Sequence, residues 1–92
     1  MARKIEKKLR NAIASLSTGV YYEHFHTWYE ALEQLLGEYG FTPQEDYPAI
    51  YNDEGRDSMG VVDPQTGEEV GYIWYSWYRM PSSRWEVICY VA

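Results

Sequence analysis

The chain has 92 residues, of which 46% are hydrophobic and 17% aromatic, and its formal net charge is −6. A chain of this length forms one domain with a small core, so we expect residues 1–92 to be a single domain. The sequence lacks an apolar run long enough to span a membrane and lacks a signal-peptide core, so we expect no membrane association.

Cysteine content points to a reducing environment. Cys89 is the only cysteine, which excludes a disulfide within the chain. It lies among apolar residues in a strand-like pattern, so we interpret it as a small buried hydrophobic residue rather than a nucleophile. A reduced cysteine is typical of a reducing compartment, and we expect a cytoplasmic protein.

Charge is distributed unevenly along the chain. Residues 1–10 carry a net charge of +4, residues 23–69 carry −11 and residues 70–92 carry +1. The basic end and the acidic middle could neutralise each other within the fold. The acidic middle could also face a basic partner, or simply keep the protein soluble.

The first predicted element is an amphipathic helix over residues 3–16. Its apolar positions recur at helical spacing, and they are Ile5, Leu9, Ala12, Ile13 and Leu16. Ser17-Thr18-Gly19 is expected to end this helix, because glycine and small polar residues are frequent at helix ends.

A second helix is predicted within residues 20–39. Its apolar stripe consists of Trp28, Leu32, Leu35, Leu36 and Tyr39. Thr27 and Glu30 fit a capping box, which would start the helix at Thr27. Residues 20–26 could instead form a short strand or an earlier start of the helix that makes Thr27 internal. Gly40 is expected to stop the helix.

The acidic middle of the chain is predicted to be mostly loop. Residues 41–58 contain Pro43, Pro48 and Gly55 among many acidic and amide side chains. Only residues 49–51 have the composition of a short strand.

Three antiparallel strands are predicted after this loop, over residues 59–62, 70–79 and 85–91. Turns at residues 63–67 and 80–84 connect them. The predicted fold class is α+β, a two-layer sandwich of two N-terminal helices on a three-stranded β-meander. Its core is expected to contain Ile5, Leu9, Ile13, Leu32 and Leu35.

The strand over residues 70–79 is aromatic on both faces, which is its most informative property. Alternation directs Tyr72, Trp74 and Tyr78 to one side. The opposite side takes Ile73, Tyr75 and Trp77. Two helices can cover only one of these sides. We expect Trp74 in the core and the Tyr75/Trp77 side exposed, because the neighbouring Arg79 would suit an interface.

No arrangement of side chains predicts catalysis. His24 and His26 could share a metal ion if they lay on a strand, but no second pair of ligands follows them. Pairs of neighbouring carboxylates, as at Asp53 and Glu54, read as solvated loop charges. Phosphate-binding, dinucleotide-binding, hydrolase and metalloprotease motifs are all missing. We therefore expect no enzyme, no cofactor and no bound metal.

Direct binding of nucleic acid is not expected either. Exposed aromatic residues on a sheet can stack on bases. The basic residues, however, concentrate in residues 1–10, and only Arg79 and Arg84 flank the aromatic strands. The acidic middle would repel phosphate.

In size, charge and lack of catalytic motifs, the chain resembles the small acidic proteins with which phages and mobile elements inhibit host defence, including anti-CRISPR and anti-restriction proteins. That resemblance implies stoichiometric binding to a nucleic-acid-binding protein with a basic surface, and it carries over no individual residues. The alternative is an accessory module that forms a homodimer or larger oligomer through its aromatic sheet. The predicted partner-binding residues are Glu45, Asp46, Asp53, Glu54, Asp57, Tyr75, Trp77 and Arg79.

Overall fold

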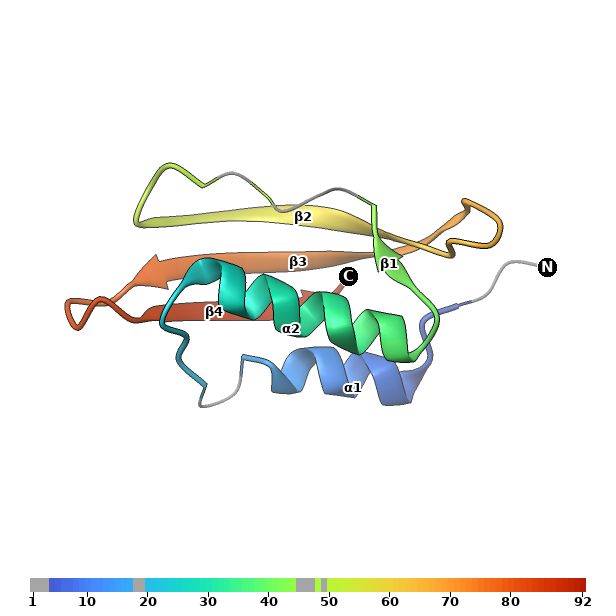
Figure 1. The fold of residues 1–92 in the computed structure, drawn as a ribbon, viewed down its shortest axis with the longest axis horizontal. Helices are drawn as coiled ribbons and strands as arrows, with labels where there is room; N and C mark the ends of the chain where they lie inside the picture. The colour runs from blue at the N-terminus through green and yellow to red at the C-terminus, as the bar shows by residue number, and fades with distance from the viewer. Residues whose placement is uncertain (1–3, 18–19, 45–47, 49) are drawn as a thin grey trace.

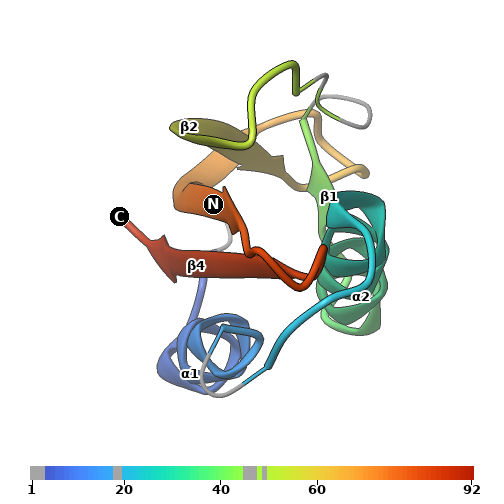
Figure 2. The same ribbon diagram turned by 90° about the vertical axis from the view of Figure 1, so that its left-hand side faces the viewer.

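The fold is α+β, as predicted, with two helices packed on one side of a curled antiparallel sheet (Figures 1 and 2). The computed structural model describes residues 4–17, 20–44, 48 and 50–92. Its elements are α1 (Lys7–Ser15), α2 (Phe25–Glu38), β1 (Thr42–Pro43), β2 (Glu54–Val62), β3 (Glu69–Arg79) and β4 (Trp85–Val91). The strand order follows the sequence, β1-β2-β3-β4. No described helix is long and apolar enough to cross a membrane.

The sheet has four strands where three were predicted. The additional strand, β1, is only two residues long and pairs Thr42 with Val62 and Pro43 with Val61. A pair of residues is too short to carry the alternation by which strands are recognised. Proline is tolerated here because β1 lies at the edge of the sheet.

Strand β2 starts at Glu54, five residues earlier than the predicted start at Met59. It pairs with β3 along its length, from Glu54 opposite Tyr78 to Val62 opposite Glu69. Its first half is polar, with glycine at position 55, and was therefore assigned to the loop. Backbone pairing with the long β3 overrides that local preference. Ile50 and Tyr51 are not in a strand, and Ala49 is outside the described residues.

Helix α2 begins at Phe25, so Thr27 is internal and the predicted capping box does not form. His24 is the N-cap, and its side chain makes no capping hydrogen bond. Tyr22 forms an isolated antiparallel bridge with Trp85 instead, with N–H···O distances of 2.9 and 2.7 Å. Both alternatives for residues 20–26 therefore occur: Tyr22 forms a short strand-like pair, and the helix begins before Thr27. Gly40, with φ of 79°, follows the helix end as predicted.

Helix α1 spans Lys7–Ser15 and is shorter than the predicted 3–16. Thr18 and Gly19, which were expected to end it, lie outside the described residues. The helix covers the free edge of β4. The Arg10 guanidinium donates to the carbonyl of Val91 at 3.4 Å, and the Ser17 hydroxyl donates to the carbonyl of Cys89 at 3.5 Å. These contacts shield backbone groups that an edge strand would otherwise expose.

The core is close to the predicted one. Ile5, Leu9, Ile13 and Leu32 are buried, whereas Leu35 is only half-buried and Leu36 is completely buried. Positions four residues apart lie above one another on a helix, so Trp28, Leu32 and Leu36 form the centre of the stripe. Leu35 lies at its margin.

Cys89 is buried, as expected, at the interface between β4 and α1. Its thiol donates to the carbonyl of Ile13 at 3.2 Å, and burial raises its pKa. A raised pKa keeps the sulfur protonated near neutral pH, which makes it a poor nucleophile.

The positions of Leu35 and Leu36 give a direct test of the packing. Leu36→Ala should lower the free energy of unfolding by about 2–5 kcal/mol, because it leaves a cavity in the core. Leu35→Ala should cost clearly less, because its side chain is already partly in water. Urea unfolding of the two variants measures the difference, and equal losses would contradict the assigned helix orientation.

Candidate binding face of the sheet

The aromatic strand β3 divides its side chains between two environments, and the sides are reversed relative to our prediction. Tyr75 is 3% exposed and Ile73 is fully buried beneath the helices, whereas Trp74 is 45% exposed. Tyr72 and Tyr78 are exposed on the same side as Trp74. The predicted alternation is therefore confirmed, but the prediction that Trp74 is core and Tyr75 exposed is wrong.

The first turn of α2 explains which side is buried. The ring of Phe25 contacts aromatic rings from two strands, with centroid distances of 6.1 Å to Tyr75, 5.7 Å to Trp77 and 6.2 Å to Trp85. The ring of Trp28 lies 5.1 Å from that of Tyr75. Such tilted and edge-to-face pairs are favourable beyond the area they bury. The side of β3 that bears Tyr75 and Trp77 is thus held against the helices.

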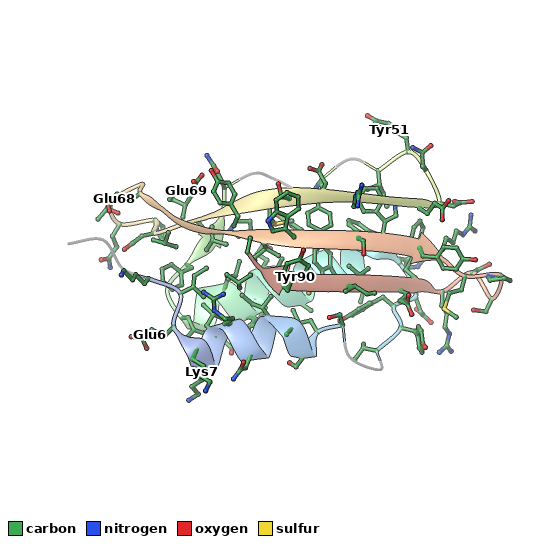
Figure 3. The ribbon with its side chains drawn as sticks, turned by 180° about the vertical axis from the view of Figure 1, so that it is seen from behind. Glu6, Lys7, Tyr51, Glu68, Glu69 and Tyr90 are labelled. Atoms are coloured by element: carbon green, nitrogen blue, oxygen red, sulfur yellow. The ribbon has the colours of Figure 1, made fainter. Side chains whose placement is uncertain are left out.

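The opposite side of the sheet is the candidate site, and we call it the open face. No described helix covers it, as Figure 3 shows from behind, with Tyr90 near its centre. Its side chains come from alternate positions of β2, β3 and β4, and they are Glu54, Arg56, Ser58, Tyr72, Trp74, Ser76, Tyr78, Glu86, Ile88 and Tyr90. The apolar members Tyr72, Trp74, Tyr78, Ile88 and Tyr90 are all exposed. Several exposed apolar side chains on one face make it the candidate for an interaction site.

The strand register arranges nine of these residues in three rows across β2, β3 and β4, and Tyr72 lies beyond the third row. The row nearest the β3–β4 turn contains Glu54, Tyr78 and Glu86. The next contains Arg56, Ser76 and Ile88, and the third contains Ser58, Trp74 and Tyr90. The first row is therefore acidic and aromatic, the second contains the basic Arg56, and the third is aromatic and neutral.

A shallow hollow of about 520 Å³ lies in the middle of the open face. Arg56, Trp74, Ser76, Ile88 and Tyr90 line it, together with Tyr75. Aromatic walls with a few polar groups are typical of surfaces that accept a side chain from a partner.

Carboxylates lie at both ends of the open face. Glu54 and Glu86 occupy the first row, and the structure pairs neither of them with a described basic side chain. At the other end, hydrogen bonding to the Glu69 carboxylate and its negative charge raise the pKa of Tyr72. Arg56 is the only basic residue among the alternate positions that form the open face.

The residues predicted to bind a partner do not form a single cluster. Glu54 lies on the open face, whereas Asp57 is exposed on the other side of β2. Arg79 and Asp53 are exposed and form an ion pair of 3.7 Å, of a kind that contributes little to stability. Glu45 and Asp46 lie outside the described residues.

Trp77 is half-buried rather than freely exposed. Its indole N–H donates to the carbonyl of Asn52 at 3.1 Å, and its ring lies directly over Gly55. A Cβ atom at position 55 would come within 2.6 Å of that ring, so glycine permits the close approach. Trp77 therefore packs beneath the sheet with Phe25 and is not part of the open face.

His24 and His26 lie at the start of α2. Their rings stack, with centroids 5.1 Å apart and planes inclined by 7°, and His24 has extended backbone angles before the helix begins. In the part of the chain that the structure describes, no three histidine, cysteine or acidic residues come together in a group that could hold a metal ion. This histidine pair supplies no further argument for a site.

Comparison of the chain with protein-family models, with curated proteins and with solved structures finds no match. The open face is therefore interpreted from its own geometry and charge. Those two properties define an uncovered aromatic surface with acidic groups at its ends.

Of the open-face residues the sequence-based prediction named only Glu54. It missed the aromatic ones, Tyr72, Trp74, Tyr78 and Tyr90, and the charged Arg56 and Glu86. A signal for them exists in the last strand, where Val87, Cys89 and Val91 share one side. Small apolar residues on one side indicate the core, and the register then places Trp74 on the opposite side. That inference needs the hairpin register, which the five-residue turn leaves open.

A pair of substitutions on β3 tests the assignment of its two sides. Tyr75→Ala should cost about 3–5 kcal/mol of unfolding free energy, because a large buried ring is lost. Trp74→Ala should change it by about 1 kcal/mol or less, as exposed positions usually do. Thermal and urea unfolding measure both values, and a larger loss for Trp74→Ala would invert the assignment.

Proposed function

We propose that the protein is a small non-catalytic binding protein whose open face docks on a basic surface of a nucleic-acid-binding protein. The observation that carries the proposal is the set of exposed rings on the open face, from Tyr72, Trp74, Tyr78 and Tyr90. Tyrosine and tryptophan supply much of the binding energy in protein interfaces. Exposing them to water gives a monomeric protein no advantage of its own.

Charge supports a basic partner. The chain has a net charge of −6, and the first row of the open face adds two carboxylates at the edge of the aromatic surface. Complementary charges accelerate encounter and disfavour wrong partners. A surface that normally holds nucleic acid is basic, so an acidic protein with aromatic anchors is suited to occupy it.

The same charges argue against nucleic acid as the ligand. Aromatic residues on a sheet can stack on unpaired bases, but phosphate contacts need several basic side chains. The open face offers only Arg56, and Glu54 and Glu86 lie one row away.

Pairing of two copies through the open face is the alternative. If the strands of two copies stacked in the same direction, β2 of one copy would lie over β4 of the other. Glu54 would then face Glu86 of the other copy, because both residues lie in the row of Tyr78. Like charges at such an interface are unfavourable, and the net charge of −6 adds repulsion between copies.

This binding role agrees with inhibition of a host defence protein by a phage or mobile element, of the anti-CRISPR or anti-restriction type. Inhibition would then be stoichiometric, with one molecule of the protein preventing one molecule of its target from binding nucleic acid. The aromatic side chains would supply affinity, and the acidic groups would supply attraction and specificity.

We test the proposal with immobilised wild-type protein and two variants, Trp74→Ser and Tyr51→Ser. Tyr51 is 90% exposed and lies away from the open face, so it is a matched aromatic control (Figure 3). A partner captured from a lysate of host cells is purified and loaded with its nucleic acid. We expect wild type and Tyr51→Ser to release that nucleic acid from the partner one-to-one. Trp74→Ser should lose at least about tenfold in affinity for the partner. Binding of the wild type to the partner should weaken at high salt.

Two outcomes would overturn the proposal. Equal binding by all three proteins would show that the open face is not the interface. Sedimentation equilibrium of the wild type as a stable dimer, with a monomer for Trp74→Ser, would favour the oligomeric alternative.

A further inference from the structure

We infer that Tyr78, with Glu54 and Glu86 on either side, forms a subsite for a lysine or arginine side chain of the partner. The inference rests on the proposed function and names the group that the acidic end of the open face recognises. Tyr78 is exposed, and the register places Glu54 and Glu86 directly opposite it on the two neighbouring strands.

Sheet geometry makes this row suitable for an organic cation. Neighbouring strands lie about 4.8 Å apart, so the two glutamates flank the tyrosine at about that spacing on each side. A cation within about 6 Å of the centre of the Tyr78 ring is attracted by the ring. Each glutamate side chain is long enough to turn towards the same cation. One guanidinium or ammonium group can therefore meet the ring and both carboxylates together.

Among the described residues, no ion pair competes for the carboxylates of this row. Glu54 is exposed, Glu86 is half-buried, and among the described residues neither forms an ion pair with a basic side chain. The nearby Arg79 points to the other side of β3, where it pairs with Asp53. The row therefore presents two carboxylates without an ion-pair partner around an exposed ring, and Arg56 lies one row away.

The arrangement suits a basic side chain better than a metal ion. A divalent ion needs several oxygen ligands within about 2.0–2.6 Å, whereas the carboxylates here start from strands on opposite sides of a tyrosine. Arg56 in the next row repels a second cation. A basic side chain of the partner is therefore expected at the Tyr78 row rather than beside Arg56.

The probe is an acetylated and amidated hexa-arginine peptide, titrated at low salt while backbone amide and tyrosine ring signals are followed by NMR. We expect shifts centred on Glu54, Tyr78 and Glu86. The double variant E54Q/E86Q should weaken binding by at least about tenfold. The matched control E33Q/E68Q removes the same charge from exposed positions on α2 and the β2–β3 turn, and should weaken it by less than about threefold.

Two substitutions of Tyr78 separate attraction of the peptide by the aromatic ring from attraction by the net negative charge of the protein. Tyr78→Phe keeps the aromatic face and should retain binding, whereas Tyr78→Leu should lose it. Equal weakening by E54Q/E86Q and E33Q/E68Q, equal binding by both ring variants, or no peptide binding by the wild type would overturn the subsite.

Binding of the variants to the captured partner distinguishes failure of the Tyr78 subsite from failure of the proposed function. If Trp74→Ser releases the partner while E54Q/E86Q does not, the subsite is wrong and the binding function stands. If neither Trp74→Ser nor E54Q/E86Q weakens binding of the partner, both the subsite and the proposed function are wrong.

Discussion

The structure depends on the contact between the first turn of α2 and one side of β3. Phe25 and Trp28 pack on Tyr75, and Phe25 also contacts Trp77. This contact fixes the phase of the strand, because a shift by one residue would exchange every side chain between core and solvent. Once Tyr75 is buried, Trp74 must be exposed, and the cross-strand pairing extends the same division to β2 and β4.

The exposed side of the sheet is a consequence of having two helices and one sheet layer. Two helices bury the side that bears Ile73, Tyr75 and Trp77, and the described chain has no further element to cover the other. A purely structural sheet would carry polar residues there. The open face instead carries large rings among a few charged groups, which is the composition of an interface. That composition supports the proposed binding function.

Much of the fold could be predicted from local patterns, and the site could not. Helical spacing identified both helices, and the turn at residues 63–67 forms as predicted, with the N–H of Gly67 donating to the carbonyl of Asp63 at 2.8 Å. The polar start of β2 lacked any local strand signal, since its pairing with β3 is what makes it a strand. The phase of β3 was undetermined because both of its sides are aromatic. Only contacts between distant residues, such as Phe25 with Tyr75, settle it.

The most direct test of the account is the accessibility of the aromatic side chains in the monomeric protein. NMR spectra recorded with a soluble gadolinium chelate report which rings meet solvent. We expect strong broadening of the signals of Trp74 and Tyr90, and sharp signals for Trp28 and Tyr75, at every protein concentration. Protection of Trp74 in the monomer, or broadening of Tyr75, would contradict the assignment of the open face and with it the proposed mode of binding.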